Sequence, residues 1–210
     1  MGDRRFRRIG LLGGSFNPAH RGHRLISLLA LRMLDLDEIW WLVSPQNPLK
    51  PVHGMAPFAE RMASARRVAC HPRIKISDLE ARLGCHYTAH TLAALRQRFP
   101  RSRFVWLMGA DNLRQIPLWE SWTRIFALAP IAVFARPAYS LGALGGLAAQ
   151  RFARYRVAPS RARHLADMTP PAWVFFATRL DPVSATAIRE RRRRAVFARQ
   201  AALRRRAIDS

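Results

Sequence analysis

The segment IGLLGGSFNPAHRGH, residues 9–23, determines the fold class of this 210-residue chain. Its first four residues are apolar or glycine and predict a short buried strand. The glycine pair Gly13-Gly14 and the dipeptide Asn17-Pro18 predict a turn, and the amphipathic run over residues 22–34 predicts a helix. A strand, a glycine-containing loop and a helix in this order indicate an α/β fold, in which ligands bind beyond the carboxyl ends of the strands.

The same alternation continues through most of the chain. Further strands are expected at residues 38–44, 73–77, 103–108, 131–135 and 173–177, and further helices at residues 58–70, 88–99 and 121–128. Because parallel neighbours need crossover connections, this order predicts one domain over residues 1–210, built on a doubly wound parallel sheet with helices on both faces. Residues 137–171 do not continue the alternation of strands and helices and are expected to form an insertion of loop and short helices. Residues 185–206 are expected to form an arginine-rich C-terminal helical segment.

The charge of the chain is strongly positive. There are 36 Lys and Arg against 13 Asp and Glu, a formal net charge of +23, with a basic N-terminal arm at residues 1–8 and a second concentration at residues 189–206. Such a field attracts polyanions such as nucleic acid, acidic lipid or free nucleotides. The charge therefore leaves a non-enzymatic function open, that of a basic nucleic-acid-binding module. Arginine runs are more often solvated helix faces, and the aromatic interleaving typical of single-strand platforms is not seen here, so we expect no specific nucleic-acid partner.

Three features of the sequence indicate the cellular compartment of the protein. No run of about 18 apolar residues occurs, so no membrane span and no membrane partner are expected. The apolar stretch at residues 9–12 is too short for the hydrophobic region of a signal peptide. Two cysteines, Cys70 and Cys85, are too few for a disulfide framework. These features favour the cytoplasm.

The loop after the first predicted strand carries the strongest chemical signal. It matches neither the G-x-x-x-x-G-K-[ST] pattern of a P-loop nor G-x-G-x-x-G, so a Walker-type NTPase and a dinucleotide-binding dehydrogenase both lose support. Paired glycines let backbone N–H groups approach a phosphate, and a helix that begins nearby adds the positive end of its dipole. His20 and His23 are three residues apart, so both imidazoles project from one helix face and suit the stabilisation of negative charge on phosphorus. By spacing alone, two ordinary helix-start histidines are an equally good interpretation.

This loop and a second stretch resemble one superfamily. The pattern H-x-G-H at residues 20–23 resembles the signature of the nucleotidyltransferases, and VSATAIR at residues 183–189 resembles their I-S-S-T-x-I-R element, with Ala185 in place of the second serine. The resemblance implies a Rossmann-like nucleotidyltransferase fold, with His20, His23 and Arg189 as catalytic residues. The ATP-binding residues that it implies are Gly13, Gly14, Ser15, Phe16, His20, His23, Ser184, Thr186 and Arg189.

Four stretches in the middle of the chain narrow the resemblance. NPLKP at 47–51, YTAHTL at 87–92, GADN at 109–112 and LWESW at 118–122 are together similar to the bacterial nicotinate-nucleotide adenylyltransferases, and the similarity covers about residues 9–194. It implies that backbone at Tyr87 and Thr88 receives a nicotinate carboxylate, that Trp119 stacks on the pyridine ring and that Asp111 contacts ribose. The full set of expected acceptor-binding residues is Asn47, Lys50, Tyr87, Thr88, Asp111, Trp119 and Arg136.

Each acceptor assignment has a structural alternative. Thr88 can be a helix N-cap, Trp119 a half-buried core aromatic residue and Asp111 the cap of a short helix. Lys50 and Arg136 are expected near the strand ends, where cations neutralise phosphates. The case for Arg136 is the weaker of the two.

The resemblance implies transfer of AMP from ATP to nicotinate mononucleotide by direct in-line attack, without a covalent intermediate. Adenylyl transfer to nicotinamide mononucleotide or to phosphopantetheine is the alternative within the superfamily. Mg²⁺ is expected to arrive with the ATP phosphates and no protein metal site is expected, because the pairs Cys70-His71 and Cys85-His86 lack the usual spacing of zinc ligands. The sequence leaves the oligomeric state open.

Overall fold

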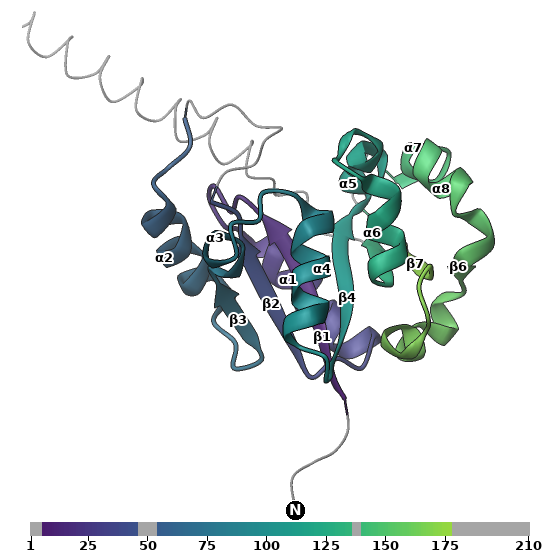
Figure 1. The fold of residues 1–210 in the computed structure, drawn as a ribbon, viewed down its shortest axis with the longest axis horizontal. Coiled ribbons are helices and arrows are strands. Elements are labelled where there is room, and N and C mark those ends of the chain that lie inside the picture. The colour runs from purple at the N-terminus through teal and green to yellow at the C-terminus, as the bar shows by residue number, and fades with distance from the viewer. Residues whose placement is uncertain (1–5, 46–53, 136–139, 178–210) are drawn as a thin grey trace, which may run out of the picture.

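A computed structural model describes residues 6–45, 54–135 and 140–177 of the chain, and the structural statements below refer to these ranges. Their strands form one parallel sheet in the order β3-β2-β1-β4-β5-β7-β6 (Figure 1). The strands are β1 (Arg7–Gly14), β2 (Glu38–Val43), β3 (Ile74–Ser77), β4 (Ser102–Gly109), β5 (Ile131–Phe134), β6 (Arg156–Val157) and β7 (Trp173–Phe176).

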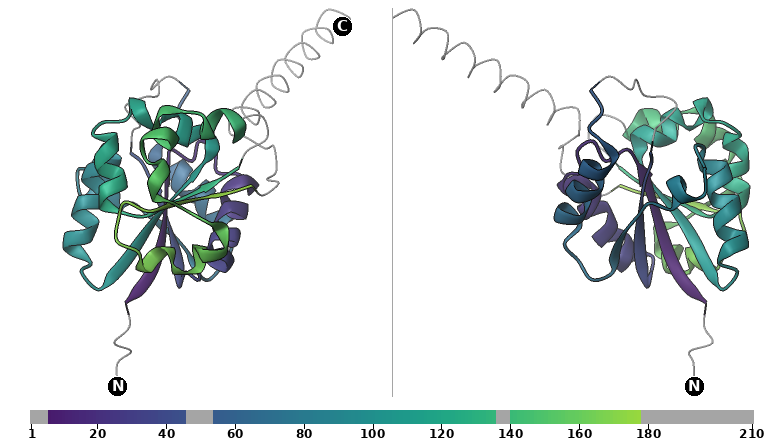
Figure 2. Two further views of the ribbon diagram at one scale, coloured as in Figure 1. Left: turned by 90° about the vertical axis from the view of Figure 1, so that its right-hand side faces the viewer. Right: turned by 60° about the vertical axis from the view of Figure 1, so that its left-hand side comes forward.

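Helices cover both faces of this sheet (Figure 2). On one face, α1 (Arg21–Met33), α2 (Phe58–Ala69) and the 3₁₀ segment η3 (Pro159–Asp167) pack over one apolar cluster. A second cluster lies on the opposite face. The remaining helical segments are α3 (Leu79–Arg82), α4 (Thr88–Arg98), α5 (Ala110–Gln115), η1 (Ile116–Leu118), α6 (Trp122–Leu128), α7 (Ser140–Leu144), α8 (Leu147–Arg151) and η2 (Ala153–Tyr155).

Strand β1 lies in the middle of the sheet and is buried on both faces. Leu11 packs into one apolar cluster and Leu12 into the other, as the period of two along a strand requires. The glycine pair lies inside this strand, where Gly13 is in register with Leu42 of β2 and Gly14 with Val43. The prediction of a turn at Gly13-Gly14 is therefore wrong. A Cβ at Gly13 would run into the indole ring of Trp106, so packing is the reason for glycine at this position.

The chain order places a switch point beside β1. From β1 the chain proceeds to β2 and β3 in one direction, and it then crosses back to β4 and β5 on the other side of β1. In open α/β sheets the ligand binds in the crevice at the carboxyl ends of the strands where this reversal occurs. Here those ends are Gly14 of β1 and Gly109 of β4.

The doubly wound parallel sheet and its main elements confirm the sequence prediction, with boundaries that agree to within two residues. The short elements α3 and β6 were not expected, and α5 was considered only as a short helix capped by Asp111, whereas its N-cap is Gly109. The described part of the expected insertion, residues 140–171, contains short helices and also β6, which pairs with β7 at the sheet edge. Of the basic arm predicted at residues 1–8, residues 1–5 lie outside the described residues, whereas Arg7 and Arg8 are the first residues of β1 and not part of an arm. The C-terminal segment at residues 185–206 also lies outside the described residues. None of the described helices is long and apolar enough to cross a membrane.

Candidate active site

Two histidines meet at the start of α1, close after the carboxyl end of β1. His20 is the N-cap residue of α1, and its ring centroid lies 3.8 Å from that of His23. The backbone N–H of His20 donates a hydrogen bond to Nδ1 of His23 at 3.2 Å. Because Nδ1 accepts this bond, a neutral His23 carries its proton on Nε2. His23 then presents an N–H donor at the position where the helix dipole already favours an anion.

Buried aromatic side chains pack against the His23 ring. Phe16, in a left-handed conformation at φ 47°, lies with its ring 4.8 Å from His23 and stacked on Trp41 at 5.0 Å. The indole N–H of Trp41 donates to Oγ of Ser27 at 2.8 Å, and that hydroxyl donates to the backbone oxygen of His23 at 2.9 Å. The Phe16 side chain is 2% exposed, so it supports the histidine pair from within the core.

The other expected ATP-binding residues of the described part lie on the same segment. Gly13 and Gly14 end β1, and the buried Ser15 follows them. Sequence reasoning missed two residues that join this loop to its neighbours. The Asn17 side chain bonds the backbone of Gly54 and Ala56, and the guanidinium of Arg61 bonds several carbonyl oxygens beside the loop. The loop between β1 and α1 is thus bonded to neighbouring segments at Ser15 and at Asn17.

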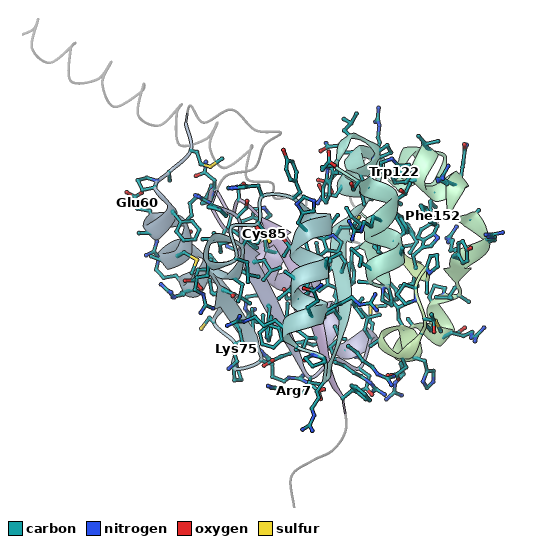
Figure 3. The ribbon with its side chains drawn as sticks, viewed as in Figure 1. Arg7, Glu60, Lys75, Cys85, Trp122 and Phe152 are labelled. Atoms are coloured by element: carbon teal, nitrogen blue, oxygen red, sulfur yellow. The ribbon has the colours of Figure 1, made fainter. Side chains whose placement is uncertain are left out.

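The expected carboxylate site lies at the start of α4. Tyr87 is the N-cap residue and Thr88 the first helical residue, so Thr88 is not the cap. The Tyr87 side chain is exposed, and its ring contacts that of His90 edge-on at 5.7 Å. A helix N-terminus of this kind offers unpaired backbone N–H groups to an anion. Cys85, two residues before it, lies toward the end of the sheet opposite Arg7 (Figure 3), which is the side of the strand carboxyl ends.

A buried carboxyl lies behind this helix start. Glu80 of α3 is 7% exposed and accepts a hydrogen bond from the Thr91 hydroxyl at 3.2 Å. Burial raises the pKa of the Glu80 carboxyl to about 7, although hydrogen bonds from Thr91 and Ser44 act in the opposite direction. Burial also raises the pKa of the Cys85 thiol, with a further contribution from the negative charge of Glu80. No pattern in the sequence marks Glu80 as buried.

Asp111 and Trp119 follow the carboxyl end of β4. Asp111 is the second residue of α5, and Gly109 is the N-cap residue of that helix. Trp119 follows η1, is half-buried and packs against the apolar cluster on the face of the sheet that α4 and α6 cover. Phe152 belongs to the same cluster and Trp122 packs against it (Figure 3), and their ring centroids lie 5.9 Å apart. Trp119 is thus a half-buried aromatic residue, as its structural interpretation expects, and its stacking on a pyridine ring stays a prediction.

The remaining expected site residues lie outside the described ranges. They are Asn47, Lys50, Arg136, Ser184, Thr186 and Arg189. Within the described ranges, no three His, Cys, Asp or Glu side chains group in a way that can hold a metal ion.

Comparisons with known proteins show the family of the chain. The model of the cytidylyltransferase-like family matches residues 11–191. A probable nicotinate-nucleotide adenylyltransferase of Bradyrhizobium sp. (strain ORS 278) is 54% identical over 182 residues, which are 87% of this chain and 95% of the relative. One of Parvibaculum lavamentivorans is 53% identical over 184 residues, 88% of this chain and 92% of the relative.

A solved structure shares the fold. The nicotinic acid mononucleotide adenylyltransferase of Plasmodium falciparum, complexed with NaAD, superposes with a TM-score of 0.59 at 16% identity, over 85% of this chain and 77% of that one. The family model covers most of the chain, and the relatives are more than 50% identical to it, so the two comparisons together show the family. The chain belongs to the cytidylyltransferase-like family and, within it, to the nicotinate-nucleotide adenylyltransferases.

Proposed function

We propose that this enzyme transfers AMP from ATP to nicotinate mononucleotide and releases pyrophosphate, a step of NAD biosynthesis. The observation that carries the proposal is the histidine pair, with ring centroids 3.8 Å apart, at the start of α1 beside the switch point of the sheet. Relatives more than 50% identical are named for this activity. The P. falciparum structure of the same fold is complexed with NaAD, the product of such a transfer.

The reaction needs positioning more than covalent chemistry. A phosphate oxygen of the mononucleotide is anionic at neutral pH, so it attacks the α-phosphorus of ATP without a general base. The Nε2–H of His23, together with His20 and the amino end of α1, would stabilise the negative charge that develops there. Arg189 would steady the departing pyrophosphate. Alignment of the two substrates then supplies most of the remaining rate enhancement.

The two substrates would occupy neighbouring parts of the crevice. ATP would lie along Gly13, Gly14, Ser15 and Phe16 and the histidine pair, with Ser184 and Thr186 on its triphosphate. The acceptor would place its carboxylate at the Tyr87-Thr88 backbone and its pyridine ring on Trp119. Asp111 would bind its ribose, and Asn47, Lys50 and Arg136 would complete its site.

Further features of the proposal concern the metal and the compartment. Mg²⁺ would enter as part of the Mg·ATP substrate, held by phosphates and water with little help from protein carboxylates. We propose that the enzyme works in the cytoplasm.

One assay tests the proposal directly. The protein is incubated with Mg·ATP and, in separate reactions, with nicotinate mononucleotide, nicotinamide mononucleotide and phosphopantetheine, and each product is identified by mass spectrometry. We expect the highest kcat/KM with nicotinate mononucleotide, together with one pyrophosphate per dinucleotide. A preference for either other acceptor would contradict the acceptor assignment. Steeply salt-dependent binding of nucleic acid without any transfer would instead favour the basic-module alternative.

A further inference from the structure

The guanidinium of Arg61, on α2, is buried among backbone carbonyls. It is 2% exposed. Its Nε donates to the oxygen of Ala56 at 3.0 Å and its Nη2 to that of Pro45 at 2.7 Å. Its Nη1 donates to two carbonyl oxygens, those of Ser15 at 2.8 Å and Ser44 at 2.7 Å. One side chain thus connects four points of the backbone.

Among the residues that the structure describes, this cation has no carboxylate partner. Fully buried arginines are normally paired with an acid, because burial of an unpaired charge is costly. Within the described ranges, Arg61 forms hydrogen bonds to backbone oxygens and lies 5.3 Å from the centroid of the Phe58 ring, but it forms no ion pair. Burial lowers the pKa of Arg61. The carbonyl dipoles compensate the charge, and the charge in turn fixes the carbonyls.

The four carbonyls belong to the two segments that the proposed reaction must align. Ser15 lies in the loop that leads to the histidine pair. Ser44, Pro45 and Ala56 lie on either side of residues 46–53, which carry Asn47 and Lys50 of the proposed acceptor site. The planar guanidinium therefore joins the ATP loop to Ser44 and Pro45 on one side of residues 46–53, here called the acceptor segment, and to Ala56 on the other side.

A second contact joins the same two segments. The Asn17 amide nitrogen donates to the oxygen of Gly54 at 3.1 Å, and its side-chain oxygen accepts from the N–H of Ala56 at 3.2 Å. Asn17 lies on the same loop as Ser15. The two segments are thus joined twice, once within the core by a charged group and once nearer the surface by an amide.

We propose that Arg61 is a positioning residue for adenylyl transfer, which fixes the ATP loop at Ser15 relative to residues 44–45 and 54–57, the described flanks of the acceptor segment. The inference rests on the proposed function. In-line attack requires the two reacting atoms to be held in line, and a displacement of about 1 Å lowers the rate about a hundredfold. Lysine would retain the charge, but its ammonium is compact and lacks the planar fork that reaches carbonyls on several sides. The geometry of the fork is therefore the property to test.

The first test compares R61K with R67K, a matched control on the exposed side of the same helix. Both variants are assayed below their unfolding transitions, with the folded fraction measured by circular dichroism. For R61K we expect kcat per folded molecule to fall about tenfold to a hundredfold, the scale of a misaligned ternary complex, while the Kd for Mg·ATP alone changes less than about threefold. R67K should retain the kcat of the unchanged enzyme. A residue with only a structural role would lower the folded fraction and leave kcat per folded molecule intact, and that result would overturn the proposal.

The second test is independent of the acceptor. Hydrogen exchange is followed by mass spectrometry with and without a non-hydrolysable Mg·ATP analogue. In the unchanged enzyme we expect the analogue to slow exchange at residues 13–20 and also at residues 54–57, because Arg61 joins them. In R61K only residues 13–20 should be slowed. Failure of the analogue to affect residues 54–57 in the unchanged enzyme would also overturn the proposal.

A milder variant covers the case that R61K does not fold. F58L removes the ring next to the guanidinium and keeps all four hydrogen bonds. We expect a partial fall in kcat and weaker transmission of protection to residues 54–57, and an F58L enzyme with neither change would contradict the positioning role. A wrong acceptor assignment is recognised separately, since it changes which mononucleotide is consumed but not the exchange pattern with the ATP analogue alone.

Discussion

Replacement of Glu80 by glutamine tests the account of the buried carboxyl behind α4. The pKa of Glu80 is about 7 in the folded protein, against 4.5 for an ordinary glutamate, because burial disfavours the charged form. Between these two values the unfolded chain has lost the proton that the folded protein retains. The contribution of Glu80 to stability therefore falls as the pH rises from about 4.5 to about 7 and is constant above that. At about 1.4 kcal/mol per pH unit, the loss is about 3 kcal/mol.

Glutamine mimics the protonated acid and does not titrate. It can keep hydrogen bonds to the Thr91 and Ser44 hydroxyls, so E80Q should match the unchanged protein near pH 4.5 and exceed it in free energy of unfolding by about 3 kcal/mol at pH 8. The assay is urea unfolding at several pH values, followed by tryptophan fluorescence. E60Q, which replaces an exposed glutamate of α2, is the control. A difference between E80Q and the unchanged protein that does not vary with pH would refute the reasoning.

Three further predictions concern the crevice. H23A should lower kcat about a hundredfold or more, the scale for one preorganised donor, with a far smaller change in ATP binding by calorimetry; a nearly unchanged turnover would remove His23 from catalysis. W119A should raise KM for nicotinate mononucleotide and leave KM for ATP nearly constant, whereas a lower Tm with both KM values unchanged would favour the purely structural interpretation. G13A should lower the free energy of unfolding by about 1–3 kcal/mol in urea titrations, because the added Cβ runs into the Trp106 ring; unchanged stability would mean that the ring can move aside.

Hydrophobic periodicity was sufficient to predict the long elements of the fold. Helix α1 is long enough to show a clear period and β4 contains a continuous apolar run, and the predicted limits of both are within one residue of those observed. The elements α3, α5 and β6, of four, six and two residues, are too short to show one. The glycine pair was misread for a different reason. A local rule assigns Gly-Gly to a turn, whereas the need for glycine at position 13 comes from Trp106, far along the chain.

The same limit applies to the site. The spacing of His20 and His23 predicted two rings on one face, because both residues belong to a single helix start. Arg61 gave no such signal. It shares α2 with the exposed Arg66 and Arg67, in a chain with 36 Lys and Arg, and only the tertiary contacts distinguish a buried guanidinium from a solvated one.

The buried side chains of Arg61 and Glu80 both bond to Ser44, the residue that follows β2. The backbone oxygen of Ser44 accepts a hydrogen bond from Arg61, and its side chain bonds Glu80. The two groups nevertheless act differently, because Glu80 is joined through Thr91 to α4, whereas Arg61 joins the segments on either side of the crevice. E80Q should thus change the pH dependence of stability while kcat per folded molecule is retained. R61K should lower kcat per folded molecule without that pH dependence. If both variants lost activity in proportion to their loss of stability, Arg61, Ser44 and Glu80 would form a single structural unit. The separate positioning role of Arg61 would then be wrong.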